Sequence, residues 1–273
     1  MEGASRESLR SALARFEEQV APQGAATAGE VSEGLYAVAG LLDREPSLRR
    51  AFTDPASSPA ARRRLVDGLL GRQLSSLPVD VVRELVASRW HSPADLREAV
   101  ETLAAQAALA AADADGVLDD VEDELFRFAR LLEREPQLRA ALTDPGLPRE
   151  RRTALVSSLL QGRAQPATLR LVDVVVTRPR GRSLESSLEE LSRLAAARRQ
   201  RLVARVRVAR PLDEQQAQRL SAALERLYGR AVALQFDVDE RVLGGMQVRV
   251  GDEVIDGTVA RRLGDARRRL GMA

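Results

Sequence analysis

The chain has 273 residues, of which 44% are hydrophobic and 3% aromatic, so its cores must be built mainly from Leu, Val and Ala. The absence of cysteine excludes disulfides and thiolate metal ligands, and a single histidine, His91, excludes the usual zinc-binding set. All 42 basic residues are arginine, so the pI of 9.8 overstates a net charge of only +2. The sequence shows neither an apolar stretch of membrane-spanning length nor a signal-peptide core.

The first part of the chain contains a duplicated helical module. Residues 35–55 recur as residues 125–145, and half of the positions from 35 to 70 are identical at this offset of 90 residues. Apolar residues follow helical spacing in both copies. The repeated Arg-Glu-Pro segment predicts that one helix ends and a short one begins at Pro46 and at Pro136, because proline disfavours helical geometry in the preceding residue.

A long helix near residues 93–113 lies between the two copies. It is rich in alanine, which allows neighbouring helices to approach closely. An amphipathic helix near residues 5–20 precedes the first copy at a similar spacing, so the helix near 93–113 is able to serve both modules. We therefore predict two helical bundles that share or abut this helix, with residues 1–114 as the first domain and residues 115–199 as the second.

Charged runs along the chain suggest two other functions. Arginine runs at 62–64, 198–201 and 267–269 make an Arg-rich nucleic-acid-binding protein the alternative, although nearby acidic residues favour solvated helix faces. The acidic run at 119–124 would suit a cation, but a helix start is favoured because acids complement a helix N-terminus. No catalytic, metal-binding or cofactor-binding constellation is found in the sequence. We therefore predict neither enzymatic activity nor a cofactor or metal.

The pattern changes near residue 200 to that of a small α/β module, which we assign to a third domain, residues 200–273. Alternating apolar residues predict strands at 202–209 and 231–238. Between them we expect a helix that is capped by Asp213 and ends at Gly229. The buried side of this helix is expected to carry three leucines: Leu220, Leu224 and Leu227.

Glycines and aspartates organise the last part of the chain. Gly244 and Gly245 mark a bend before a short apolar run, and a tight hairpin turn connects this run to a second one. An Asp-Gly-Thr segment then ends the hairpin and caps a final amphipathic helix. A phosphate-binding loop is disfavoured, because it requires a lysine and the chain has none. The structural markers of this region are Gly244, Gly245, Gly251, Asp252, Asp256, Gly257 and Thr258.

The predicted fold is therefore mainly α, with two duplicated helical bundles followed by a small β-α-β-β-α unit. The spacing GG-x5-GD-x3-D-G-T-V-x2-RL in residues 244–263 closely resembles the C-terminal signature of the delta subunit family of rotary ATP synthases, which includes the mitochondrial oligomycin sensitivity-conferring protein. The family more often has Ser at the position of Thr258, and both hydroxyls are able to cap a helix. The second copy, residues 115–199, resembles the N-terminal bundle of the family, whereas the first copy is extra.

The resemblance implies a non-catalytic peripheral-stalk (stator) subunit of a proton-translocating rotary ATP synthase. In that family the helical bundle receives the N-terminal helix of an alpha subunit in an apolar groove, and the C-terminal part meets b-type stalk subunits. It also implies a place at the cytoplasmic face of a bacterial cell membrane, reached only through partners, with no nucleic acid bound. Because residues 115–273 match the family more closely, we expect this part alone to suffice for binding the head.

Overall fold

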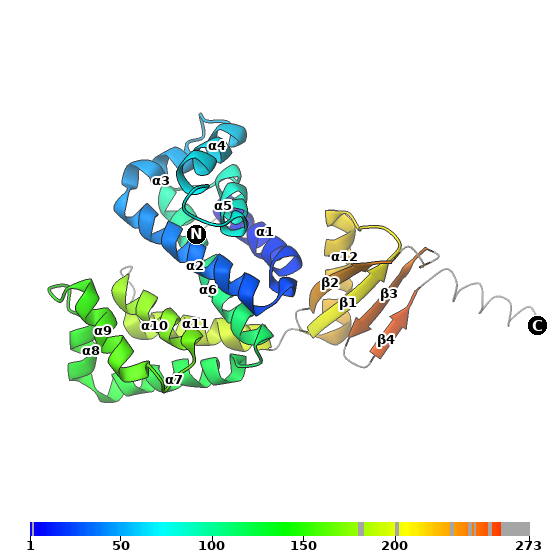
Figure 1. Ribbon diagram of the computed structural model, residues 1–273. Helices are drawn as coiled ribbons and strands as arrows, with labels where there is room; N and C mark the ends of the chain where they lie inside the picture. Colours follow the sequence, from blue (N-terminus) through cyan, green and yellow to red (C-terminus); the bar gives the residue numbers. More distant parts are fainter. Residues whose placement is uncertain are drawn as a thin grey trace, which may run out of the picture. The chain divides into compact units, whose positions relative to one another are not determined.

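The computed structural model contains two compact units, residues 1–199 and residues 200–273, which are described separately (Figure 1). The first unit is helical and the second combines a small sheet with a helix, which confirms the predicted fold class. The final helix of the predicted β-α-β-β-α unit lies outside the described residues. These are residues 1, 3–179, 183–199, 202–229, 232–239, 242, 244–250 and 253–257.

The helices of the first unit begin and end largely where the sequence predicts. Pro46 and Pro136 each start a short helix after a longer one has ended, and proline suits this position because its missing N–H needs no partner. The helices are α1 (Gly3–Gln19), α2 (Ala25–Arg44), α3 (Pro46–Thr53), α4 (Pro59–Leu70), α5 (Ser76–Ala87), α6 (Pro93–Ala114), α7 (Leu118–Arg134), α8 (Pro136–Thr143), α9 (Arg149–Leu160), α10 (Pro166–Thr177) and α11 (Leu184–Arg199), with a short 3-10 helix at Ala21–Gln23.

The helix α6 belongs to both copies of the repeat. At the offset of 90 residues, α1 to α5 correspond to α6 to α10, and α11 occupies in the second copy the place that α6 has in the first. We therefore call α1–α6 the first copy and α6–α11 the second copy. The helix α6 packs against α1, α2, α3 and α5 and also against α7, α10 and α11. The prediction that this helix serves both modules is confirmed, whereas the boundary between residues 114 and 115 stays a prediction.

One continuous hydrophobic cluster runs through the first unit. Its equivalent positions are filled in both copies: Phe52 and Leu142 are fully buried, as are Val66 and Val156. The helices α2 and α6 approach closely, and the buried Ser32 donates a hydrogen bond from its Oγ to the Ala104 carbonyl oxygen over 2.9 Å. Small residues along α6 permit this contact, as its alanine content suggested. None of the helices in the described part is long and apolar enough to cross a lipid bilayer.

The second unit is built on a mixed sheet. Its elements are β1 (Leu202–Val208), α12 (Glu214–Tyr228), β2 (Val232–Val238), β3 (Met246–Val250) and β4 (Glu253–Asp256), and the strand order is β2-β1-β3-β4. The strands β1 and β2 are parallel and are joined through α12, whereas β3 pairs antiparallel with both β1 and β4. Parallel strands need such a crossover, while β3 and β4 form a hairpin. The predicted strands and hairpin are therefore confirmed.

Local chemistry determines where α12 begins and ends, but the burial predicted for one of its leucines is wrong. The Asp213 carboxylate accepts a hydrogen bond from the Gln216 amide over 2.7 Å, and Gly229 ends the helix in the left-handed region at φ 68°. Leu224 is buried against the sheet, but Leu227 is 63% exposed, so its predicted burial is wrong. The buried stripe advances in steps of four from Leu220 to Tyr228, which turns Leu227 away from the core.

Candidate functional site

A groove lies between α1 and α5 of the first copy, with a volume of about 550 Å³. Its apolar lining comes from both helices: Phe16 and Val20 are buried at its base, whereas Ala12, Leu77 and Val81 are half-buried. Half-buried apolar side chains that line a concavity still have apolar surface to lose from water. The groove therefore has the character of a docking surface for an apolar helix face.

Charged side chains form the rim of this groove and pair with one another. Glu84 binds both Arg15 and Arg63, the latter over 3.1 Å, and Arg83 binds Asp80. All of these groups are substantially exposed, so each pair contributes little to stability. The pairs link α1, α4 and α5 along the rim, while the apolar groove lining that keeps some exposure is Ala12, Leu77 and Val81.

The corresponding place in the second copy, between α6 and α10, is covered by α2. Arg15 and Gln19 are exposed on α1, whereas their counterparts on α6, Ala105 and Leu109, are buried. The helix α2 packs along α6 and also reaches α10, because its Glu33 forms an ion pair with Arg170 of α10 over 2.7 Å. The two copies thus carry the same pair of helices, with the groove open in one and occupied in the other.

Arg178, which directly follows α10, fastens this arrangement. Its guanidinium Nη1 donates to the Tyr36 carbonyl oxygen of α2 over 3.0 Å. Gly40 of α2 makes room for it, since a Cβ there would lie 2.7 Å from Arg178 Nη2. Burial, together with the nearby charge of Arg149, lowers the pKa of Arg178 below its usual value. Arg178 nevertheless remains protonated at neutral pH and joins the two copies.

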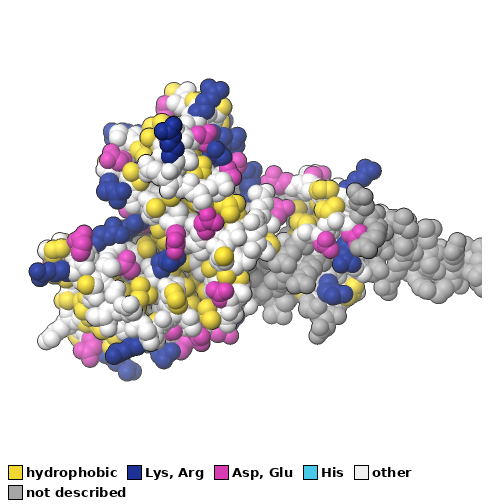
Figure 2. Space-filling model, in the orientation of Figure 1, with side chains coloured by type: hydrophobic (Ala, Val, Ile, Leu, Met, Phe, Trp, Pro, Cys, Tyr) yellow, Lys and Arg dark blue, Asp and Glu magenta, His cyan; other side chains and the backbone are white. Residues whose placement is uncertain are grey.

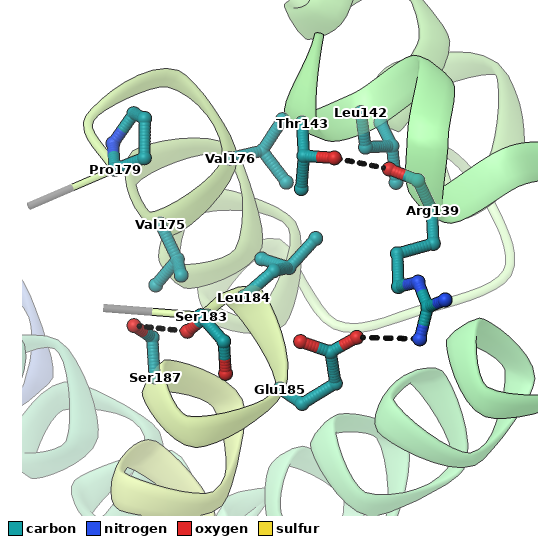
Figure 3. A pocket seen from close by; sticks show the side chains of 10 residues that line it. All are labelled: Arg139, Leu142, Thr143, Val175, Val176, Pro179, Ser183, Leu184, Glu185 and Ser187. Carbon is teal, nitrogen blue, oxygen red and sulfur yellow. Dashed lines mark hydrogen bonds and ion pairs between the residues drawn. The ribbon is translucent and has the colours of Figure 1, made fainter. Parts of the chain in front are cut away.

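A second hollow, of about 480 Å³, lies beside α8, α10 and the start of α11 (Figure 3). Its polar side chains point toward one another: Arg139 pairs with Glu185 over 3.3 Å, and the Thr143 hydroxyl donates to the Arg139 carbonyl oxygen over 2.8 Å. The hydrogen bond from its own backbone amide is the main reason that the pKa of Glu185 is lowered, and Arg139 lowers it further. Glu185 is therefore ionised at neutral pH and pairs with Arg139, and the Thr143 hydroxyl points at a carbonyl rather than at a base that would activate it.

The acidic run at 119–124 serves the structure of the second copy. The Glu124 carboxylate accepts hydrogen bonds from the Gln165 amide over 2.9 Å and from the buried Thr168 hydroxyl over 2.5 Å, which caps the start of α10. Asp123 pairs with Arg127 over 2.7 Å, within the same helix. Within the described residues, no cluster of three or more carboxylates or imidazoles is arranged to hold a metal ion.

Several arginines of the runs that prompted the nucleic-acid alternative form contacts within the chain. Arg62 is buried and caps the end of α5, and Arg63 belongs to the groove rim. Arg198 is buried between Glu17, at 2.7 Å, and Asp113, at 3.1 Å. Figure 2 shows acidic and basic side chains interspersed on the visible face of the helical unit rather than one basic surface. The run at 267–269 lies outside the described residues. These contacts disfavour a phosphate-binding face.

The described markers of the C-terminal unit lie at one end of the β3–β4 hairpin. Gly244 and Gly245 have φ values of 74° and 80°, which favour glycine, and lead directly into β3. Asp256 pairs in register with Gln247, and the Gly257 amide donates to the Met246 carbonyl oxygen over 2.9 Å. Gly251, Asp252 and Thr258 lie outside the described residues, as does the expected final helix. The assignment of all seven residues as family markers stays a prediction.

Sequence reasoning missed the groove because an apolar stripe that faces a core and one that faces a partner look alike. A usable signal was present in the comparison between copies. Position 15 is Arg and its counterpart 105 is Ala, while position 19 is Gln and its counterpart 109 is Leu. A polar residue that aligns with an apolar one indicates that only one of the two helix faces is covered.

Comparison with known proteins relates both units of the chain to one family. A family model described as the ATP synthase delta (OSCP) subunit matches residues 100–270, and the match begins inside α6. Proteins named ATP synthase subunit delta are similar over nearly the whole chain. Those of Parafrankia sp. (strain EAN1pec), Frankia alni and Streptomyces avermitilis are 52%, 50% and 53% identical, covering 99%, 99% and 98% of this chain and the same shares of their own lengths. The first copy is therefore present in these relatives as well.

Proposed function

This chain belongs to the ATP synthase delta (OSCP) subunit family, and from that premise we propose how it connects the two parts of the enzyme. As a family member it is a structural subunit of the peripheral stalk of a proton-translocating rotary ATP synthase, and it associates with the other subunits of that complex. We propose that its helical unit receives the N-terminal helix of an alpha subunit and that its C-terminal unit meets a b-type stalk subunit.

The observation that carries this proposal is the division of the chain into two compact units joined by continuous backbone. A stator must hold the catalytic head against the torque of the rotor, and it needs one contact on the head and another on the stalk. When one chain bears both contacts, formation of the first raises the effective concentration for the second. Two interfaces of moderate strength are then sufficient to resist rotation.

The helical unit offers a surface of the required kind for the head. The groove between α1 and α5 has a volume of about 550 Å³. Its apolar base and charged rim suit an amphipathic helix. For the C-terminal unit, Leu227 and Val238 are exposed apolar residues at 63% and 50%. These residues support a contact of that unit with the apolar stripe of a stalk helix.

We further propose that the chain is non-catalytic and is held at the cytoplasmic face of a bacterial cell membrane only through its partners. The internal pairing of polar groups in the hollow near Arg139 and Glu185 supports the first point. The nucleic-acid alternative is not favoured, because Arg62, Arg63 and Arg198 bind carboxylates or a helix end.

The proposal is tested with membranes that contain the ATP synthase without this chain. ATP hydrolysis by the head is expected to persist, while ATP-driven proton pumping, followed by the quenching of a pH-sensitive dye, is expected to be lost. Addition of the purified full-length chain should restore pumping. Pumping that proceeds equally well without the chain would refute a stator role.

A further inference from the structure

The last turn of α11 is the place where the chain leaves the helical unit. Arg198 and Arg199 end this helix, and the second compact unit begins with the next residue. The Arg198 side chain is only 8% exposed, and it lies 2.7 Å from a carboxylate oxygen of Glu17 and 3.1 Å from one of Asp113. Arg199 is half exposed and lies 3.2 Å from a carboxylate oxygen of Glu122. We call these five residues the exit anchor.

The exit anchor joins α11 to helices of both copies. The helix α11 packs against α6, α7 and α10, all of which belong to the second copy. Arg198 extends the contacts of α11 to Glu17 of α1, which belongs to the first copy, and to Asp113 of α6, which belongs to both. Arg199 binds α7 of the second copy. A displacement of the last turn of α11 would therefore pull on both copies at once.

The repeat shows that charge is used here in place of apolar packing. Ala108 and Leu109 of α6 correspond to Arg198 and Arg199 of α11, and both are buried. The helix α6 continues for five residues beyond Leu109, to Ala114, whereas α11 ends at Arg199. Helix ends open most readily because their last backbone groups lack helical partners. The charged contacts thus lie where α11 is otherwise weakest.

Helix dipoles favour the arginines at this place. Both lie in the last turn of α11, where positive charge complements the negative end of the dipole. Glu17 and Asp113 lie in the last turns of α1 and α6, where a carboxylate alone is disfavoured. The Arg198 guanidinium therefore offsets the negative ends of three helices. Because it is buried, these interactions are screened less by salt than those of exposed pairs.

We propose that the exit anchor holds the end of α11 under force, so that force arriving through the backbone from the C-terminal unit is divided between the two copies. This inference rests on the proposed function, because a stator must carry such force. Without the anchor, force on α11 acts first on its contacts within the second copy. With the anchor, it also acts on α1, which packs on the same continuous hydrophobic cluster.

Pulsed electron paramagnetic resonance of the full-length chain tests whether the anchor holds the helix end. The chain has no cysteine, so Gln19→Cys on α1 and Ala197→Cys on α11, both at exposed positions, place two spin labels unambiguously. Adding Arg198→Met should broaden the distribution of label distances at least about twofold, because the last turn then opens locally. The matched control is Arg193→Met, which breaks an exposed ion pair with Glu190 in the same helix and should leave the distribution unchanged.

A second variant, Glu17→Gln, weakens the same ion pair from α1, and thermal unfolding shows whether each variant is folded. Broader distance distributions in the folded Arg198→Met and Glu17→Gln chains, with Arg193→Met unaffected, support the anchor. General destabilisation does not broaden the distribution of a chain that is still folded, so this readout separates the anchor from a merely structural role. Unchanged distributions in both folded anchor variants would overturn the proposal.

The division of force is tested with the unlabelled variants in membranes that contain the ATP synthase without this chain. Arg198→Met should restore fewer protons pumped per ATP hydrolysed than the unaltered chain, whereas Arg193→Met should restore the full ratio. A broadened distance distribution together with full pumping would overturn the division of force. Failure of the unaltered chain to restore pumping would refute the stator role and the force-carrying role with it, while the distance measurement still decides whether Arg198 holds the helix end.

Discussion

The two copies of the helical module reach the same architecture with different chemistry at the same position. Gly34 of α2 lies directly against α5, where an added Cβ would come within 2.5 Å of Pro78 Cβ. Its counterpart on α7 is Glu124, which instead accepts a hydrogen bond from Thr168, the counterpart of Pro78, over 2.5 Å. The helices α2 and α5 are joined by a close apolar contact, whereas α7 and α10 are joined by a polar cap. The two copies therefore share their topology but not this contact.

The equivalent helices α2 and α7 also differ in how exposed their outer faces are. Tyr36 of α2 is buried at 8% exposure, while its counterpart Phe126 on α7 is 52% exposed. On the side of Tyr36, α2 meets the second copy through Arg178, which donates to the Tyr36 carbonyl oxygen, and through the Glu33–Arg170 ion pair. Within the described helical unit, no hydrogen bond or ion pair of this kind is found at Phe126 of α7. Differences between the copies therefore mark the places where one copy covers the other. The same logic identifies the open groove between α1 and α5.

The largest expected effects concern the shared core. Phe52→Ala and Leu142→Ala remove equivalent, fully buried side chains, and each should lower the free energy of unfolding by about 2–5 kcal/mol. Because one hydrophobic cluster spans both copies, both substitutions are expected to shift the same transition of the helical unit in chemical denaturation. Two transitions, each responding to one substitution only, would show that the copies unfold independently.

A smaller loss is expected from the charge cluster that joins the copies. Arg198→Met removes the 2.7 Å ion pair to Glu17 of α1, whose side chain is 18% exposed. Urea denaturation should show a loss of about 2–3 kcal/mol, below the range for a fully buried pair because Asp113 is half exposed. The control is Arg199→Met, at a position 50% exposed, which should change stability by less than about 1 kcal/mol. Equal effects of the two substitutions would contradict this role of Arg198.

The contrast between Gly34 and Glu124 predicts that substitutions at these two positions lower the stability by similar amounts for different physical reasons. Gly34→Ala forces α2 away from Pro78, and Glu124→Ala leaves the buried Thr168 hydroxyl without its acceptor, so each should cost about 1–3 kcal/mol. Gly29→Ala is the control within α2, because its added Cβ meets nothing within 4 Å and should stabilise the helix by about 0.5–1 kcal/mol. Thermal unfolding distinguishes the three, and stabilisation by Gly34→Ala would contradict the close contact.

The smallest effect is the pH dependence that arises from Glu185 in the second copy. Its pKa is lowered by its own backbone amide and by Arg139, from an unperturbed value of 4.5. The carboxylate therefore contributes stability that is fully present above pH 4.5 and is lost as the pH falls through the lower folded-state value. Glu185→Gln should lose less stability than the unaltered chain between about pH 6 and about pH 3 in urea titrations. An equal loss in both proteins would exclude this contribution.

Local chemistry explains which features were predictable. The helix breaks at Pro46 and Pro136, the cap at Asp213 and the end of α12 at Gly229 follow from the residues themselves, and the structure confirms them. The double use of α6 was also anticipated, because the repeat spacing is visible in the sequence. The exposure of Leu227 was not, since helical spacing alone allows either of two neighbouring stripes to face the sheet.

The groove could not be predicted because it depends on contacts between distant segments. Only the structure shows that α2 reaches Arg170 of α10 and Arg178, which follows α10, whereas nothing in the described helical unit reaches Leu77 and Val81 in the same way. Arg15 of the first copy corresponds to Ala105 of the second. Only with the fold in hand does this difference indicate that the surface around Arg15 is open.

The central claim is that one chain holds the head and the stalk at the same time through separate units. The most direct test is the mass, by analytical ultracentrifugation, of the full-length chain mixed with the alpha-subunit peptide, fused to a soluble carrier protein, and the soluble part of a b-type subunit. The account predicts a single complex that contains all three, from which Ala12→Arg removes only the peptide. Mutual displacement of the peptide and the b-type subunit would show that they compete for one surface and would contradict the account.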